Sequence, residues 1–286
     1  MKELTLTLTK ELEGVSDFFK ANKLKLNAKK TKMIFFRKKS LPHDHLQMDV
    51  MLDGVKLSHD DDAEFLGTII DSTLSWEKHC TKIANKISRN NGLLNRVKHL
   101  LPPNSLKLLY HSFIQPHIQY ALPAWGGCSA QNKKRIITIQ KRAIRTITKS
   151  YHTAHTEPRM KKLGLLKFED LYNLGNLLFV HDCFYGNAPT NIKNLIDIAQ
   201  NSDHNLRNHA SKPLDVKIPN FKSRAGSHSF RQAGSICWNK VSGELRAISQ
   251  KGRFKRAIKN SILENYEKKA VCSNPRCRDK SNHTCT

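Results

Sequence analysis

The feature that most constrains the fold is a change of hydrophobic period between residues 65 and 79. Before Phe65, short apolar runs alternate with turn residues, whereas after His79 apolar residues recur at every third or fourth position. A period of two is typical of strands, and a period of 3.6 is typical of helices. The sequence therefore predicts an α+β chain, in which a short strand-containing part is joined at this stretch to a mainly helical body.

The first part is expected to begin with an amphipathic helix that ends near residues 21–22. A turn centred on Asn27 and a strand that ends at Phe36 should follow. Asp53-Gly54 separates two short apolar runs, and this dipeptide is a strong signal for a tight hairpin turn. A further short strand is expected at 64–70.

Two basic amphipathic helices are expected in the next part. One carries apolar residues at helical spacing from Ile83 until Pro102-Pro103 stops the pattern, and the other covers 131–149. The basic residues of the first helix fall within an arc of roughly 80° at about 100° per residue, to one side of its apolar face, and should flank a groove. The two sets are Lys78, Lys82, Lys86, Arg89 and Arg96, then Lys134, Lys141, Arg142, Arg145 and Lys149.

Between these two helices, Asn104 or Ser105 is expected to cap a third helix that Pro116 kinks or ends. Tyr120 and Trp125 should then pack against the helices as part of an aromatic turn.

The whole chain is expected to have four parts. They are a sheet-containing part at 1–71, a basic helical part at 72–150, a C-terminal extension at 151–270 that is partly irregular at 187–235, and a tail at 271–286. Trp238 is expected to anchor the irregular segment, and a last basic helix should follow.

The charge of the chain restricts its partners. It has 286 residues, with 49 Lys and Arg against 24 Asp and Glu, which leaves a formal charge of +25. Such a charge favours a polyanion, and nucleic acid is the first candidate. An acidic membrane is the weaker alternative, because no apolar run approaches the ~20 residues of a spanning helix.

The N-terminus does not resemble a signal peptide, and the seven cysteines are mostly scattered. An intracellular protein of the nucleus or cytoplasm with reduced thiols is therefore expected rather than a secreted one.

Five blocks of sequence, taken together and in order, carry a family resemblance. The blocks are Asn22-Lys-Leu-Lys-Leu-Asn27 with Lys30-Thr31-Lys32 and Phe35, Phe65-Leu-Gly67 with Ile70-Asp71, Leu74 and Trp76, Gln115-Pro-His-Ile-Gln-Tyr120 with Trp125-Gly126, Gln140-Lys-Arg142, and Gly164-Leu165 with Leu171-Tyr172 and Trp238-Asn239. They resemble the reverse transcriptases of non-LTR retrotransposons, the jockey-like and related LINE elements, and the resemblance covers the chain to about residue 265.

The resemblance implies that the chain corresponds to the end of the palm, a primer-grip hairpin with Phe65, Leu66 and Gly67, the thumb and a C-terminal extension. In that family the fingers and the catalytic aspartates precede the block at 22–32, and this sequence begins shortly before that block. The family polymerises DNA with two Mg²⁺ ions held by paired carboxylates. A truncated copy without a cofactor is therefore expected, and its only acidic cluster, Asp60-Asp61-Asp62, is interpreted as a solvated turn.

Two smaller groups of residues are weighed in the same way. Lys30 and Lys32 match a motif that lies near the incoming triphosphate in such polymerases, and the alternative is a basic strand edge. Cys272, Cys277, His283 and Cys285 offer four zinc ligands within the tail, spaced C-x4-C-x5-H-x-C. The alternative for these four residues is a disordered basic tail, because the single residue between His283 and Cys285 strains tetrahedral closure.

The functional expectation has three forms. The first is a reverse-transcriptase fragment whose own activity is nonspecific binding of nucleic acid, by the backbone of a primer–template duplex. The second is a thumb portion that becomes catalytic only when a fingers–palm polypeptide complements it. The third is the product of a decayed transposon. The sequence does not indicate an oligomeric state.

Overall fold

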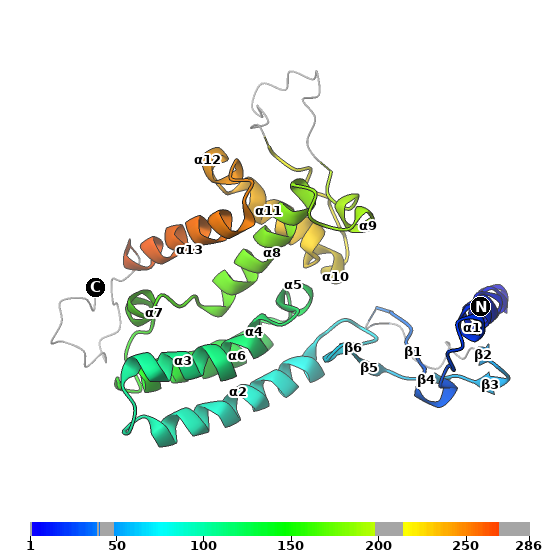
Figure 1. Ribbon diagram of the computed structural model, residues 1–286, viewed down its shortest axis with the longest axis horizontal. Helices are drawn as coiled ribbons and strands as arrows, with labels where there is room; N and C mark the ends of the chain where they lie inside the picture. Colours follow the sequence, from blue (N-terminus) through cyan, green and yellow to red (C-terminus); the bar gives the residue numbers. More distant parts are fainter. Residues whose placement is uncertain (1, 39, 41–48, 198–213, 269–286) are drawn as a thin grey trace. The chain divides into compact units, whose positions relative to one another are not determined.

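The computed structural model describes residues 2–38, 40, 49–197 and 214–268 (Figure 1). Contacts divide the chain into two compact units, Met1–His79 and Cys80–Thr286. The short strands all lie in the first unit, and the described part of the second unit is helical, so the prediction of an α+β chain with a mainly helical remainder is confirmed. The finer division into four parts stays a prediction.

The first unit is built on helix α1 (Lys2–Ala21) and a small hairpin of β2 (Met51–Leu52) and β3 (Val55–Lys56). Asp53 and Gly54 have φ angles of 48° and 76°, as the predicted tight turn requires. The Asp53 carboxylate accepts hydrogen bonds from Ser16 Oγ at 2.6 Å and Lys20 Nζ at 2.9 Å, so α1 is tied to the turn. The core of the unit consists of Val50, Leu52 and Leu57, against which Leu8 and Leu12 pack.

The predicted strand at 64–70 is wrong in its topology. The segment is a hairpin of β5 (Asp62–Phe65) and β6 (Thr68–Asp71), in which Phe65 pairs with Thr68. Leu66 and Gly67 turn the chain with φ angles of 46° and 80°, and this conformation reverses the strand. The predicted strand that ends at Phe36 is also shorter, because after the turn at Ala28–Lys30 only β1 (Lys32–Met33) pairs, in parallel with β4 (Ser58–His59).

The second unit begins inside α2 (Glu77–Val97) and continues with α3 (Pro103–Phe113), α4 (Gln115–Gln119), α5 (Leu122–Trp125) and α6 (Ala130–Ile147). The start of α3 corrects a prediction, since Pro102 and not Asn104 or Ser105 occupies the N-cap position. Pro103 follows at the first helical position, which suits proline because the N–H group there has no partner within the helix. Of the two aromatic residues expected to pack against the helices, Trp125 is fully buried, whereas Tyr120 is 53% exposed.

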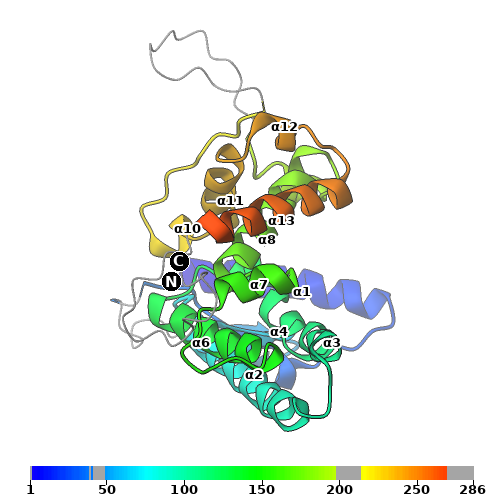
Figure 2. The same ribbon diagram turned by 90° about the vertical axis from the view of Figure 1, so that its left-hand side faces the viewer.

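Helix α8 (Phe168–Phe184) lies at the centre of this unit (Figure 1). It contacts α4, α5 and α6 as well as the later helices α11 (Phe230–Asn239) and α13 (Lys251–Lys268), which Figure 2 shows from the side. Buried Gln140 of α6 donates from Nε2 to Tyr110 Oη at 2.9 Å and to Leu166 O at 3.0 Å. Its Oε1 accepts from Phe168 N at 3.0 Å. One amide side chain therefore joins α3, α6 and the start of α8.

The remaining helices of this unit are short. They are α7 (Glu157–Leu163), α9 (Thr190–Lys193), α10 (Arg224–Ser227) and α12 (Gly243–Arg246). Trp238 of α11 is fully buried and packs against Phe184 of α8 and Phe254 of α13. Trp238 Nε1 donates to Leu214 O at 2.9 Å, and the guanidinium of buried Arg246 donates to the same oxygen at 3.0 Å. The expected anchor residue thus holds the chain around 214 against α11.

Candidate nucleic-acid interface

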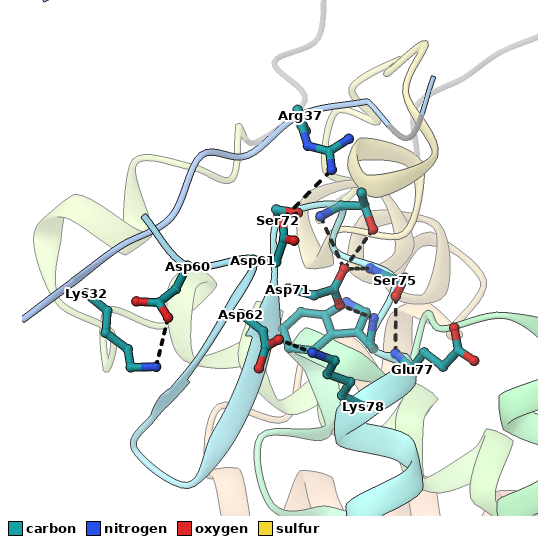
Figure 3. A network of polar contacts seen from close by, with 12 residues as sticks. Lys32, Arg37, Asp60, Asp61, Asp62, Asp71, Ser72, Ser75, Glu77 and Lys78 are labelled. Atoms are coloured by element: carbon teal, nitrogen blue, oxygen red, sulfur yellow. Dashed lines mark hydrogen bonds and ion pairs between the residues drawn. The ribbon is translucent and has the colours of Figure 1, made fainter. Parts of the chain in front are cut away.

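The loop that precedes α2 is held by Asp71, the last residue of β6 (Figure 3). Its carboxylate accepts hydrogen bonds from Thr73 N at 3.2 Å, Thr73 Oγ1 at 2.7 Å, Ser75 N at 2.9 Å and Trp76 N at 2.7 Å. Burial acts to raise the pKa of Asp71, but the bonds from Ser75, Thr73 and Trp76 outweigh it and hold the pKa below its usual value. A charged carboxylate therefore caps the loop from which α2 starts.

This loop carries backbone strain that the cap offsets. Leu74 and Trp76 have φ angles of 52° and 63°, in the left-handed region that residues other than glycine seldom adopt. His79, which is fully buried, accepts a hydrogen bond from Ile69 N on Nδ1 at 3.3 Å. The first turn of α2 is therefore fixed to the β5–β6 hairpin at two points.

The three aspartates at 60–62 each pair with a different cation (Figure 3). Asp60 pairs with Lys32 at 3.3 Å, Asp61 with Arg37 at 3.8 Å, and Asp62 with Lys78. Carboxylates that share a metal ion must converge on it, whereas these three bind separate basic side chains. Within the described residues, no group of three or more His, Cys, Asp or Glu side chains is arranged to hold a metal ion.

The predicted basic residues of α2 differ in their surroundings. Lys86, Arg89 and Arg96 are exposed, and Lys82 is half-buried. Lys78 is exposed but bonded to Asp62, and this bond raises its pKa. The exposed positive charge of α2 is therefore concentrated in its middle and C-terminal turns.

On α6, the predicted amphipathic pattern places its apolar residues in the core. Ile136, Ala143, Ile144 and Ile147 are buried. Lys134, Lys141, Arg142 and Lys149 are exposed.

Arg145 is the exception on α6. It is half-buried and donates from Nε to Ala154 O at 2.9 Å. Burial, and then the nearby Arg159 and Arg142, lower its pKa. Arg145 thus holds the loop after α6 in place.

A groove lies between α2 and α6, and among its lining residues the sequence had singled out only Arg142. Arg135 donates to Thr81 Oγ1 at 3.0 Å and Asn85 Oδ1 at 3.3 Å, and Asn91 Nδ2 donates to Ile139 O at 2.9 Å. The groove has a volume of about 280 Å³. Its lining residues are Ser88, Asn91, Gly92 and Asn95 of α2 and Ile139, Arg142 and Thr146 of α6.

The predicted primer-grip residues form the tip of the β5–β6 hairpin in the first unit. Phe65 is 63% exposed and Leu66 is 73% exposed, and Thr68 Oγ1 donates to Phe65 O at 2.7 Å across the turn. Lys30 is exposed, and Lys32 lies in β1 and pairs with Asp60. The roles predicted for these residues stay predictions.

Two further predictions concern metals and membranes. Cys272, Cys277, His283 and Cys285 lie outside the described residues. None of the helices among the described residues is long and apolar enough to cross a membrane.

Comparisons with known proteins place the chain beside a class of enzymes. Parts of it are similar to the RNA-directed DNA polymerases of insect mobile elements, and this confirms the resemblance to reverse transcriptases of non-LTR retrotransposons. No protein-family model matches the chain, and no solved structure matches it.

Three relatives illustrate the similarity. The chain is 27% identical over 103 residues to the RNA-directed DNA polymerase from mobile element jockey of Drosophila funebris, a match that covers 35% of this chain and 11% of the relative. It is 29% identical over 129 residues to the probable RNA-directed DNA polymerase from transposon BS of Drosophila melanogaster, and this match covers 44% of this chain and 14% of the relative. It is also 29% identical over 103 residues to the probable RNA-directed DNA polymerase from transposon X-element of the same species, and this match covers 35% of this chain and 11% of the relative. The matches thus span only a small part of these relatives.

Proposed function

We propose that this chain is a nucleic-acid-holding part of an RNA-directed DNA polymerase of the non-LTR type. The observation that carries the proposal is the exposed basic face on each of α2 and α6, in a chain with a formal charge of +25. Lysine and arginine on helix faces mainly contact phosphates, and such contacts position a nucleic acid without reading its sequence. The expected ligand is therefore the backbone of a primer–template duplex, bound with little sequence preference.

We further propose that the chain holds this duplex without extending it. Nucleotidyl transfer needs carboxylates that converge on two metal ions, and Asp60, Asp61 and Asp62 each pair with a separate cation. A primer-extension assay with Mg²⁺ tests this directly. Incorporation of nucleotides by the purified chain alone would contradict it.

The similarity to polymerases favours a second candidate, catalysis after complementation. A fingers–palm polypeptide from one of these elements would supply the aspartates, and this chain would supply the grip on the duplex. Extension that appears only when both polypeptides are mixed supports this candidate, and extension that does not depend on the present chain excludes it.

The binding proposal is tested by reversing charge on α2. Lys86→Glu with Arg89→Glu removes two exposed cations, and Lys10→Glu with Lys217→Glu changes the net charge equally on other elements. Binding to a fluorescent duplex is measured by anisotropy over a series of salt concentrations. For the α2 variant, the negative slope of log K against log salt should become shallower by about 2, since each lost phosphate contact removes about one unit of slope. Equal weakening by the two double variants would show that only net charge matters.

A further inference from the structure

The α2–α6 groove has the chemistry of a binding site in its own right. Its volume of about 280 Å³ is close to the lower end of the ~300–1,000 Å³ that small-molecule sites occupy. Such a space suits one planar ring system and is too small for a helix or a strand. The hydrogen bonds of Arg135 to Thr81 and Asn85 join the two helices beyond Ser88, so the groove is bounded on that side.

We propose that this groove holds one unpaired nucleobase of a bound nucleic acid, an inference that rests on the proposed function. The lining offers side-chain amides from Asn91 and Asn95, hydroxyls from Ser88 and Thr146, and the apolar side chain of Ile139. Base edges carry mixed donors and acceptors, which asparagine matches well, and enzymes that take up an unstacked base hold it with such bonds together with apolar contacts.

Asn91 is the buried amide of the groove lining. Its Nδ2 donates to Ile139 O at 2.9 Å. The Oδ1 atom of the same amide is buried and has no hydrogen-bond partner among the described residues. A buried acceptor without a donor costs roughly 1–3 kcal/mol, so a rotation of the Asn91 side chain that brings Oδ1 to a donor on a ligand in the groove is favoured. The exocyclic amino group or ring N–H of a base is such a donor.

Gly92 leaves the α2 wall of the groove open. A Cβ atom at this position would meet nothing within 4 Å. Glycine inside a helix is destabilising by roughly 0.5–1 kcal/mol relative to alanine, so the stability of α2 does not explain its presence. A larger side chain here would occupy the groove without changing any charge.

The two basic faces lie on either side of the groove. At about 100° per residue, Arg89 and Arg96 point outward from α2 on one side of it, and Lys134 and Lys141 point outward from α6 on the other. Arg142 belongs to the basic face of α6 and also lines the groove. A strand whose phosphates contact these faces would pass over the groove, and an unpaired base could turn into it while Arg142 contacts the adjoining phosphate.

The test uses a blunt duplex and two duplexes of equal charge that extend one strand of it by a single nucleotide. That nucleotide is an unpaired adenine nucleotide in one form and an abasic nucleotide in the other. The wild-type chain should bind the adenine form at least fivefold more tightly than the abasic form. Gly92→Leu should abolish this ratio and leave blunt-duplex affinity and its salt slope unchanged. Gly252→Leu, at another helical glycine with open space around it, should retain the ratio.

A second variant, Asn95→Ala, enlarges the groove instead of filling it and should reduce the ratio at least twofold. Circular dichroism of each variant verifies that the helices are formed. The base site would be overturned if the wild type bound the adenine and abasic forms equally, or if Gly92→Leu kept the wild-type ratio of these two affinities. In either case, binding of the blunt duplex would still support the proposed function. Absence of blunt-duplex binding by the wild type would instead overturn the proposed function itself.

Discussion

Replacing Asp71 by alanine should loosen the start of α2 by a predictable amount. A helix cap is worth ~0.5–2 kcal/mol, and Asp71 accepts four hydrogen bonds, three of them from backbone N–H groups. Because the carboxylate is only half-buried, we expect about 2–3 kcal/mol rather than the sum of four charge-assisted bonds. At 1.4 kcal/mol per factor of ten, exchange of the Ser75 and Trp76 amide hydrogens should accelerate by roughly 30- to 140-fold.

Hydrogen exchange followed by NMR measures this loosening residue by residue. The matched control is Asp49→Ala, which removes an exposed carboxylate of the same unit. Asp49 pairs with Lys56 on the surface, so its loss should change exchange at Ser75 by less than about twofold. Because the pKa of Asp71 is lowered in the folded chain, its contribution is complete above the unfolded pKa of about 3.9 and is lost as the pH falls through the folded value. The difference between wild type and Asp71→Ala should therefore be constant between pH 5 and 8 and shrink in stronger acid. Unchanged exchange at Ser75 and Trp76 would refute the role of this cap.

Two further predictions concern the core of the second unit. Gln140→Leu should lower the free energy of unfolding, measured by urea denaturation, by about 3 kcal/mol, because Phe168 N and Leu166 O lose their partner in a buried place; a loss below ~1 kcal/mol would contradict this. Gly126→Ala should lower the free energy of unfolding by at least ~2 kcal/mol, because a Cβ atom there would lie 2.3 Å from Tyr172 Cδ2 and 2.7 Å from Leu122 O. The control is Gly243→Ala, which should be neutral or stabilising because its Cβ atom meets nothing within 4 Å. Equal effects of the two alanines would show that close packing at Gly126 is not limiting.

The helices were predictable where one face is buried and the opposite face is charged. In α6, Ile136, Ala143 and Ile147 recur at helical spacing, and this pattern alone fixes both the helix and its buried side. The strand pattern alone did not predict the hairpin of β5 and β6, because its turn residues, Leu66 and Gly67, lie within an apolar run; the resemblance to reverse transcriptases implied a hairpin there. The backbone conformation of Leu66, with a φ of 46°, shows where the chain reverses.

The interface was predictable in composition but only partly in geometry. A helical wheel places Arg145 with the outward basic residues of α6, yet it cannot show that the Ala154 carbonyl lies within reach of its Nε. The groove depends on the pairing of two helices far apart in sequence, which no local pattern reveals. The available signal was a series of polar residues on one side of α2, at Asn85, Asn91 and Asn95.

The resemblance and the structure explain different things. Gln140 belongs to one of the blocks that resemble the reverse transcriptases, and its three hydrogen bonds show that it holds helices together. Asp71 and Trp76 belong to another, and the cap at the start of α2 accounts for both. Residues of these blocks therefore hold the framework of their own units, and the basic faces themselves must be tested by binding.

The central claim is that α2 and α6 hold a nucleic acid by its phosphates. The most direct measurement is the affinity of the wild-type chain for a short primer–template duplex over a series of salt concentrations, repeated with a duplex of unrelated sequence. The account predicts binding that weakens steeply with salt, with a log–log slope of about −3 or steeper if at least four phosphates are contacted, and with the same affinity for both sequences. Binding that is absent at low salt, or that does not change with salt, would contradict it.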